Sequence, residues 1–181
     1  MDIKIAKFKN GAKGAFSFVF DDGCYKDSTV KVIDIFKDAY AKHGVKLIAT
    51  AAHTVNFLNE GLIAFWKETF KDGWFDLASH SMDHAFAFNE DVDIERRRKD
   101  AKESKEALER IYEGMEVISY VTCGGNNTTE GCKVLNEFYY GNRSNCEVPP
   151  YNDVDTVDLI YAHAFVPNFK YKDLAPYKEY I

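Results

Sequence analysis

Short apolar runs alternate with segments of helical periodicity along most of this chain, and this alternation constrains the fold more than any other feature. Four runs rich in β-forming residues predict buried strands at 15–20, 45–51, 74–79 and 116–121. Between and after them, apolar residues spaced three and four apart predict helices at 27–43, 60–71, 93–113 and 130–140. Strands that alternate with helices at this spacing predict parallel β/α units.

Shorter patterns add detail at the two ends of this series. Residues 3–8 alternate apolar and polar and predict a strand, followed by a turn at Asn10-Gly11. Asp27 or Ser28 is expected to cap the first helix, and Gly44 to end it. Residues 139–143 and 157–162 are candidate strands near the end of the chain.

Length and charge narrow the class of protein. The chain has 181 residues, which predicts a single domain over 1–181, short of the roughly 250 residues of a full eight-unit β/α barrel. Lys and Arg total 23, Asp and Glu total 29, and the formal net charge is −6. This balance disfavours nucleic acid and an anionic membrane surface as partners. The sequence contains no signal-like or membrane-spanning apolar run, so we expect a cytoplasmic protein or the mature form of a secreted one.

Aromatic residues and cysteines leave alternatives open. Phe, Tyr and Trp make up 15% of the chain, and they either fill the core or line a groove for a flat ligand or sugar. The four cysteines, at 24, 123, 132 and 146, form no CxxC pair, so an all-thiolate zinc site is not expected. The sequence does not decide whether Cys123 and Cys132 form a disulfide.

Polar side chains gather directly after the predicted strands. In parallel β/α folds, ligands bind at the carboxyl ends of the strands. The residues at these positions are Asp21 and Asp22, then Thr50 and His53, then His80 and His84, and finally Cys123, Asn126 and Asn127. The sequence therefore predicts that a functional site is assembled from these positions.

His80 and His84 have the spacing of a metal-binding pair. Two imidazoles four residues apart on one side of a helical turn can bind one ion, although capping or structural roles also produce such pairs. The adjacent carboxylates of Asp21 and Asp22 either form a turn before Gly23 or share a catalytic task. Two imidazoles and one carboxylate leave coordination positions open, as catalytic zinc sites do, and the second carboxylate is then a candidate general base.

These residues resemble the motifs of a known family. The segment Phe18–Gly23 (sequence FVFDDG) is similar to the TFDDG-type motif of the polysaccharide deacetylases, the NodB-homology carbohydrate esterases. The segment His80–His84 (HSMDH) is similar to their H-[ST]-x-x-H motif, and the resemblance covers about residues 12–145. It implies an irregular, incomplete β/α barrel that is shortened at its C-terminal end.

The resemblance also implies a set of roles. Asp22, His80 and His84 would bind one divalent metal ion, usually zinc, and Asp21 would be the general base. The reaction would remove an N- or O-acetyl group from a carbohydrate. Two imidazoles and one carboxylate also suit cobalt, iron or manganese.

Two later motifs of the family depart from the expected pattern. Its Arg-x-Pro-Tyr motif is replaced at 121–127 by the sequence VTCGGNN, so Arg143 is either a substitute for the motif arginine or a structural residue. His163 is a candidate for the general acid of the last motif, with a structural role as the alternative.

The remaining histidines and an arginine cluster have less specific roles. His53 has either a site role or a structural one, and His43 is expected at the surface. Arg96, Arg97 and Arg98 form either a phosphate patch or, as we expect, a solvated helix face.

Three functions follow from these observations. The leading one is a metal-dependent deacetylase of an acetylated polymer or oligosaccharide. A non-catalytic carbohydrate-binding or structural module that keeps the metal residues is the first alternative. A hydrolase of C–N bonds in small cyclic amides is the second alternative. The sequence does not decide the oligomeric state.

Overall fold

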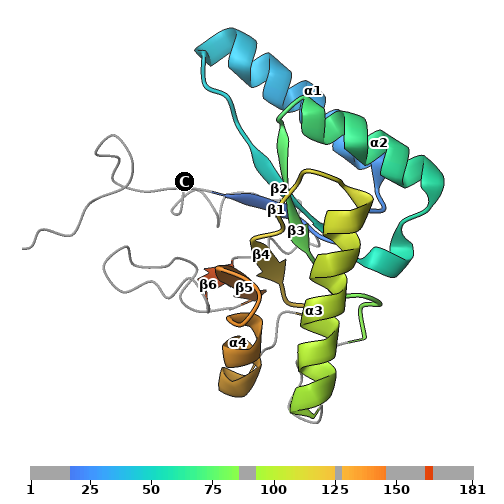
Figure 1. Cartoon of the computed structure of the whole chain (residues 1–181). Coiled ribbons are helices and arrows are strands. Elements are labelled where there is room, and N and C mark those ends of the chain that lie inside the picture. Colours follow the sequence, from blue (N-terminus) through green and yellow to red (C-terminus); the bar gives the residue numbers. More distant parts are fainter. Residues whose placement is uncertain (1–16, 86–92, 125–127, 146–161, 165–181) are drawn as a thin grey trace, which may run out of the picture.

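A parallel sheet curls through the centre of the molecule, with helices packed along it (Figure 1). The computed structural model describes residues 17–85, 93–124, 128–145 and 162–164. The strands are β1 (Phe18–Phe20), β2 (Ala49–His53), β3 (Phe75–Ser79), β4 (Ser119–Val121), β5 (Gly141–Asn145) and β6 (Ala162–Ala164). The helices are α1 (Lys26–His43), α2 (Glu60–Lys71), α3 (Ile94–Ile111) and α4 (Thr129–Leu135), with a short 3-10 turn, η2 (Val55–Phe57).

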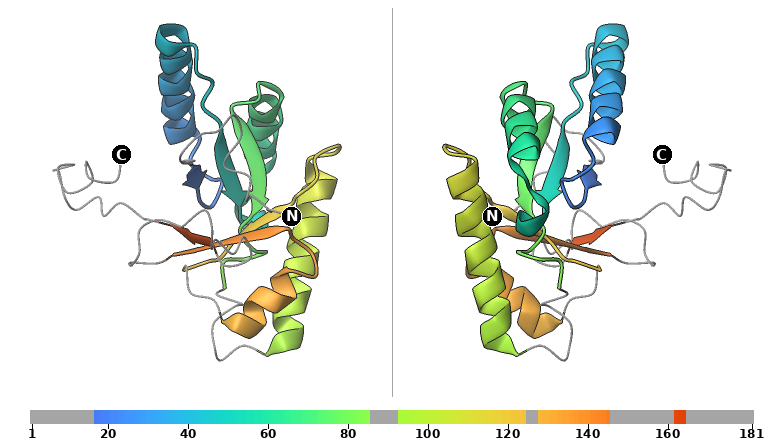
Figure 2. Two further views of the ribbon diagram at one scale, coloured as in Figure 1. Left: turned by 90° about the vertical axis from the view of Figure 1, so that its left-hand side faces the viewer. Right: turned by 90° about the vertical axis from the view of Figure 1, so that its right-hand side faces the viewer.

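The strands are hydrogen-bonded in the order of the sequence, β1-β2-β3-β4-β5-β6, and every pair is parallel. The register pairs Phe18 with Ala49 at one end of the sheet and Arg143 with Ala162 at the other. The strand direction rotates from the upright β2 and β3 to the nearly horizontal β5 and β6 (Figure 2). This curled parallel sheet with outer helices is an incomplete β/α barrel, as the resemblance implied.

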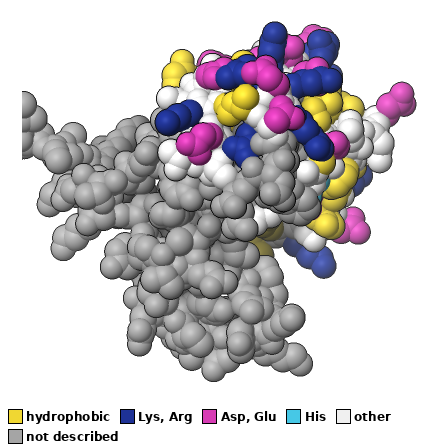
Figure 3. Space-filling model, turned by 90° about the horizontal axis from the view of Figure 1, so that it is seen from below, with side chains coloured by type: hydrophobic (Ala, Val, Ile, Leu, Met, Phe, Trp, Pro, Cys, Tyr) yellow, Lys and Arg dark blue, Asp and Glu magenta, His cyan; other side chains and the backbone are white. Residues whose placement is uncertain are grey.

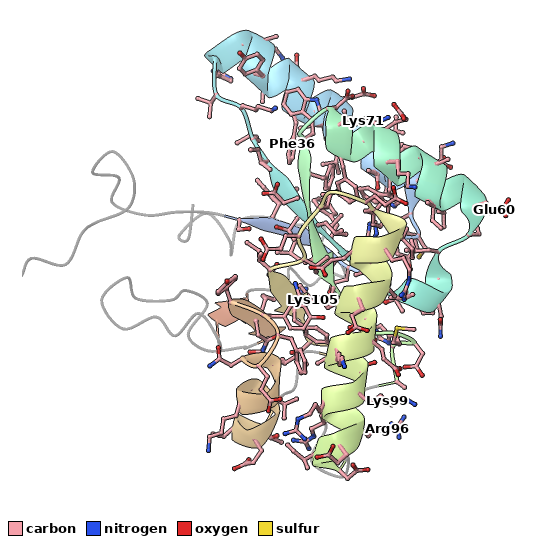
Figure 4. The ribbon with its side chains drawn as sticks, viewed as in Figure 1. Phe36, Glu60, Lys71, Arg96, Lys99 and Lys105 are labelled. Atoms are coloured by element: carbon pink, nitrogen blue, oxygen red, sulfur yellow. The ribbon has the colours of Figure 1, made fainter. Side chains whose placement is uncertain are left out.

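Aromatic side chains dominate the core between the helices and the sheet. Phe36 of α1 stacks on Phe75 of β3, with 6.4 Å between ring centroids, and Trp66 of α2 meets the same ring edge-on at 5.4 Å. Figure 4 shows Phe36 between α1 and the strands. Tyr112 and Tyr120 are also fully buried. The aromatic residues of the described chain therefore serve mainly as core.

Capping side chains explain where two helices begin. Asn59 accepts a hydrogen bond from the backbone N–H of Leu62 at the start of α2, and Asp93 accepts one from that of Arg96 at the start of α3. Gly44 ends α1 in the left-handed conformation, as expected. The expected cap of α1 was wrong, because the helix begins at Lys26 and Tyr25 at its N-cap makes no side-chain capping bond.

Three further expectations need correction. The first strand is not buried, since Phe18 and Phe20 are 37% and 36% exposed in a strand that ends the sheet order. The helix expected over 130–140 stops at Leu135, where turns lead the chain into β5. Arg97 is not solvated: it is 4% exposed, and its guanidinium donates to the Thr128 hydroxyl at the start of α4. The predicted strand at 3–8 and turn at Asn10-Gly11 lie outside the described residues.

The rest of the arginine cluster and its helix carry mixed charge. Arg96 and Lys99 point away from the sheet (Figure 4), and Arg98 pairs with Glu95 and Glu137. Positive and negative side chains are interspersed over the described surface seen in Figure 3. Each helix of the described residues is too short or too polar to cross a membrane.

Candidate metal centre

The carboxyl ends of β1, β3 and β4 bring the predicted site residues together. Asp21 and Asp22 follow β1, His80 follows β3, and Cys123 follows β4. Arg143 reaches the same place from within β5. Neighbouring parallel strands end at the same edge of a sheet, so residues far apart in sequence meet there.

Asp22 faces both histidines. Its Oδ1 atom lies 3.7 Å from Nε2 of His80 and 3.7 Å from Nε2 of His84. The same oxygen is buried and accepts no hydrogen bond from the described residues. A buried carboxylate oxygen without a donor is costly, and a cation between it and the two ring nitrogens removes that cost. Tetrahedral ligands about 2.0–2.2 Å from a zinc ion are separated by roughly 3.5 Å, so the three atoms fit a divalent ion.

His80 is held in one tautomer by a backbone carbonyl. Its ring is 2% exposed, and Nδ1 lies 2.7 Å from the carbonyl oxygen of Val121. A carbonyl can only accept, so Nδ1 carries the proton and Nε2 presents its lone pair to Asp22 and His84. Burial also lowers the pKa of His80, which favours the neutral form that binds metals.

His84 is placed by a strained loop rather than by the helical turn that its spacing suggested. Residues 80–84 form a bend in which Ser81 and His84 have positive φ angles of 74° and 60°. The hydroxyl oxygen of Ser81 accepts a hydrogen bond from the backbone N–H of His84, which closes the loop. The ring of Phe57 in η2 stacks on the His84 ring, with 6.2 Å between centroids. The two histidines therefore converge through loop geometry.

His53 packs against the turn that carries Asp21 and Asp22, and its ring remains neutral. The side chain is fully buried among Trp66, Phe70 and Tyr112, and burial lowers its pKa to about 3. Its ring packs directly against Gly23, and Trp66 donates from its indole N–H to the Gly23 carbonyl. His53 and Trp66 therefore fix the turn that carries Asp21 and Asp22. Of the two roles considered for His53, this is the structural one.

Asp21 pairs with Arg143. A guanidinium N–H of Arg143 donates to Oδ1 of Asp21, across 122 residues of sequence. The Arg143 side chain is 14% exposed and that of Asp21 is 39% exposed. One carboxylate of the pair thus faces the histidines while its neighbour is held by an arginine and remains accessible to water.

Cys123, which the sequence placed among the polar residues after the strands without giving it a role, adds a sulfur atom to the site. Its Sγ and one ring nitrogen each from His80 and His84 all lie within 4.8 Å of one another. Burial raises the pKa of this thiol to about 12. Cys24, Cys123 and Cys132 form no disulfide, so the Cys123–Cys132 bond is excluded. The position of Cys123 after a strand was the one signal of its placement in the sequence.

Four residues named from the sequence remain. His163 lies in β6 opposite Ser144 of β5, and its role as general acid stays a prediction. His43 is the exposed last residue of α1, as expected. Asn126 and Asn127 lie outside the described residues.

Comparison of the whole structure with solved structures places this site in a known fold. A polysaccharide deacetylase from Bacillus cereus superposes with a TM-score of 0.64 at 19% identity, over 81% of this chain and 45% of that one. The chain has the fold of the polysaccharide deacetylases. A de-N-acetylase from Aggregatibacter actinomycetemcomitans gives a TM-score of 0.68 at 13% identity, over 96% of this chain and 77% of that one.

A third neighbour shows that this fold also occurs without activity. It is a pseudoenzyme of carbohydrate esterase family 4 from Bacillus anthracis, with a TM-score of 0.56 at 14% identity, over 70% of this chain and 41% of that one. The chain spans less than half the length of this protein and of the Bacillus cereus deacetylase. No family model matches the sequence, and no curated protein matches it.

Proposed function

We propose that this chain is a metal-dependent hydrolase that removes acetyl groups from an acetylated carbohydrate. The observation that carries the proposal is the buried Oδ1 of Asp22, 3.7 Å from Nε2 of both His80 and His84 and without a hydrogen bond from the described residues. These three residues would hold the ion, which is zinc in this proposal. When bound, such an ion polarises an acetyl carbonyl and makes water a stronger nucleophile.

The protein's own groups divide the remaining work. Asp21 is the general base, because it sits beside the metal-binding carboxylate and its side chain is accessible to water. Arg143 holds Asp21 in one orientation and takes the place of the arginine missing from the third motif. The Val121 carbonyl keeps the proton on Nδ1 of His80, so that Nε2 stays available to the ion.

Metal content and acetate release test this proposal together. Purified protein should contain about one zinc ion per chain. It should also release acetate from acetylated chito- or xylo-oligosaccharides, and a chelator should abolish that release. His84→Ala should lose both metal and activity, whereas His43→Ala, at the exposed end of α1, should keep both.

His80→Ala serves as the supporting variant. The His80 ring is buried and also contributes to folding, so this substitution affects more than the metal. A metal-free wild-type protein would contradict the proposal. So would acetate release that is unchanged in both histidine variants.

A non-catalytic module is the second candidate. The absence of Arg, Pro and Tyr from 121–127 and the pseudoenzyme neighbour favour it. It predicts one bound zinc ion per chain with no acetate release from any oligosaccharide of the panel.

A further inference from the structure

The candidate metal centre contains a fourth donor, the thiol of Cys123. Its sulfur lies within 4.8 Å of a ring nitrogen of His80 and of His84, and the residue is 3% exposed. A tetrahedral zinc ion, with bonds of about 2.0–2.1 Å to nitrogen and about 2.3 Å to sulfur, separates the two ligand atoms by roughly 3.6 Å. The separation between the sulfur and each ring nitrogen would therefore have to shorten by up to about 1.2 Å for the sulfur to enter the coordination sphere.

Hydrogen bonds already tie this sulfur to the loop that carries both histidines. The thiol lies 3.2 Å from the His80 carbonyl oxygen and 3.2 Å from the hydroxyl oxygen of Ser81. When a metal ion binds, the S–H bond would break, a sulfur–metal bond would form, and the proton would pass to solvent. The Ser81 hydroxyl can then donate to the thiolate, because its oxygen serves as acceptor for the His84 N–H.

Charge balance favours the thiolate. Asp21 is paired with Arg143, so Asp22 is the one carboxylate in the proposed ligand set, and within that set a divalent ion keeps one uncompensated positive charge. His80 and Cys123 are both nearly inaccessible to solvent, and an unpaired charge beside them is unfavourable. A Cys123 thiolate would bring the net charge of the ion and its ligands to zero.

The position of Cys123 in the sequence supports the same conclusion. It lies in the segment that replaces the family's third motif, directly after β4. Cys132 provides a contrast, because it is also buried but sits in α4 and belongs to no described group of metal-binding side chains.

We propose that Cys123 is a fourth protein ligand of the metal, giving an Asp-His-His-Cys set. This inference rests on the metal centre of the proposed function. A thiolate in the set would select zinc and cobalt over magnesium and manganese, which prefer oxygen ligands. It would also distinguish this chain from a site whose protein ligands are only two histidines and one aspartate, and the water of the proposed hydrolysis would then be a fifth ligand.

Cobalt substitution tests the proposal with a signature that activity does not provide. Metal-free wild-type protein is reconstituted with Co²⁺, and its absorption spectrum is compared with those of Cys123→Ser and Cys132→Ser. We expect visible ligand-field bands in all three proteins. A near-ultraviolet sulfur-to-cobalt charge-transfer band should appear in the wild type and Cys132→Ser and be lost in Cys123→Ser.

The outcomes separate the two proposals. Ligand-field bands without a charge-transfer band in the wild type would overturn the role of Cys123 and leave the Asp-His-His centre standing. No cobalt spectrum in the wild type would overturn the metal centre itself, and the role of Cys123 with it.

Zinc affinity gives a second measurement. In competition with a chromophoric chelator, Cys123→Ser should bind zinc at least about tenfold more weakly than the wild type, since loss of even an indirect partner of a metal costs that much. Equal affinities would contradict the proposal. Cys132→Ser should match the wild type, and thermal unfolding of the metal-free proteins reports whether each variant is folded.

Discussion

At the scale of single residues, backbone strain gathers at the candidate metal centre. Among the described residues, Asp22, Ser81 and His84 are the non-glycine positions with positive φ, and all three belong to this site. A left-handed conformation costs about 1–2 kcal/mol for a residue with a side chain. Packing and hydrogen bonds around the site hold these conformations, as is common at functional positions.

Gly23→Ala tests how closely the aspartate turn is packed. A Cβ on Gly23 would lie 2.3 Å from the His53 ring, in a residue whose φ is +74°. We expect a loss of about 2–5 kcal/mol in the free energy of unfolding, from the left-handed strain plus overpacking. Chemical denaturation measures it.

Gly44→Ala is the matched control, because Gly44 has a φ of +69° and nothing lies within 4 Å of its added Cβ. It should lose only about 1–2 kcal/mol. Equal losses in the two variants would show that the His53 ring does not limit this turn.

Buried His53 predicts a specific dependence of stability on pH. In the unfolded chain this imidazole takes up a proton near its ordinary pKa of 6.5, whereas burial lowers its pKa to about 3 in the folded protein. Between these values the unfolded state binds more protons, so the free energy of unfolding falls as the pH drops from 6.5 toward 3. The fall between pH 7 and pH 4.5 should be about 2–3 kcal/mol from this residue.

Urea unfolding of metal-free protein at several pH values measures this slope. His53→Asn keeps a polar atom for the Tyr112 hydroxyl, which lies 3.1 Å from Nδ1, and removes the titrating ring. The variant should be less stable at pH 7 but lose less stability on acidification. An identical acid slope in both proteins would count against a neutral, buried His53.

At the scale of elements, helix α3 clamps the loop between the two histidines. Asp100 of α3 accepts hydrogen bonds from the Met82 backbone N–H and from the Tyr120 hydroxyl, both at 3.0 Å. The carboxyl group is almost fully buried, and burial raises its pKa. A buried carboxyl group is costly, so its placement at the centre of the His80–His84 loop indicates a positioning role.

Asp100→Ala should therefore weaken metal binding without touching a ligand. We expect a loss of about 10–100-fold in zinc affinity, as for other groups that orient metal ligands. Asp100→Asn keeps an oxygen acceptor for the Met82 N–H and should recover most of the affinity. Lys99→Ala, on the exposed side of the same helix, should have no effect. A wild-type zinc affinity in Asp100→Ala would refute the clamp.

Periodicity and turn residues along the sequence predicted most of the helices and strands. Helix α2 was predicted with its observed bounds because Asp72-Gly73 ends its apolar periodicity. The end of α4 was missed, because residues after Leu135 continue an apolar pattern while contacts with the sheet direct them into turns and β5. The backbone N–H of Tyr140, for example, donates to the carbonyl of Ile118, which precedes β4.

At the scale of the whole molecule, the curl of the sheet completes the site. Asp21 follows β1 and Arg143 lies in β5, so three strands separate β1 from β5 in the sheet order. A flat sheet, with strands about 4.8 Å apart, would hold the two residues roughly 19 Å apart. Only a curled sheet brings their side chains into contact.

Arg143→Gln tests whether this contact matters for catalysis. Loss of the guanidinium should leave Asp21 mispositioned, and misplacement of a catalytic group by about 1 Å can cost roughly 100-fold in rate. We therefore expect kcat for acetate release to fall about 100-fold while zinc content stays at the wild-type level. Arg143→Lys should recover part of the rate.

A wild-type kcat in Arg143→Gln would assign this residue to structure alone. Equal losses of zinc and activity would show that it acts on the metal centre rather than on Asp21.

The sequence by itself determined what depends on near neighbours along the chain. Strand and helix periodicity predicted parallel β/α units, and the short spacings within Asp21-Asp22 and His80–His84 marked the candidate metal-binding residues. Tertiary structure decided which of the distant candidates join them, and it added Asp100, which the sequence did not single out. Arg143 reaches Asp21, Cys123 approaches the histidines and Asp100 supports their loop because strand order and curl bring them together. Such contacts leave no periodic signal, since they depend on the path of the whole sheet rather than on residues a few positions away.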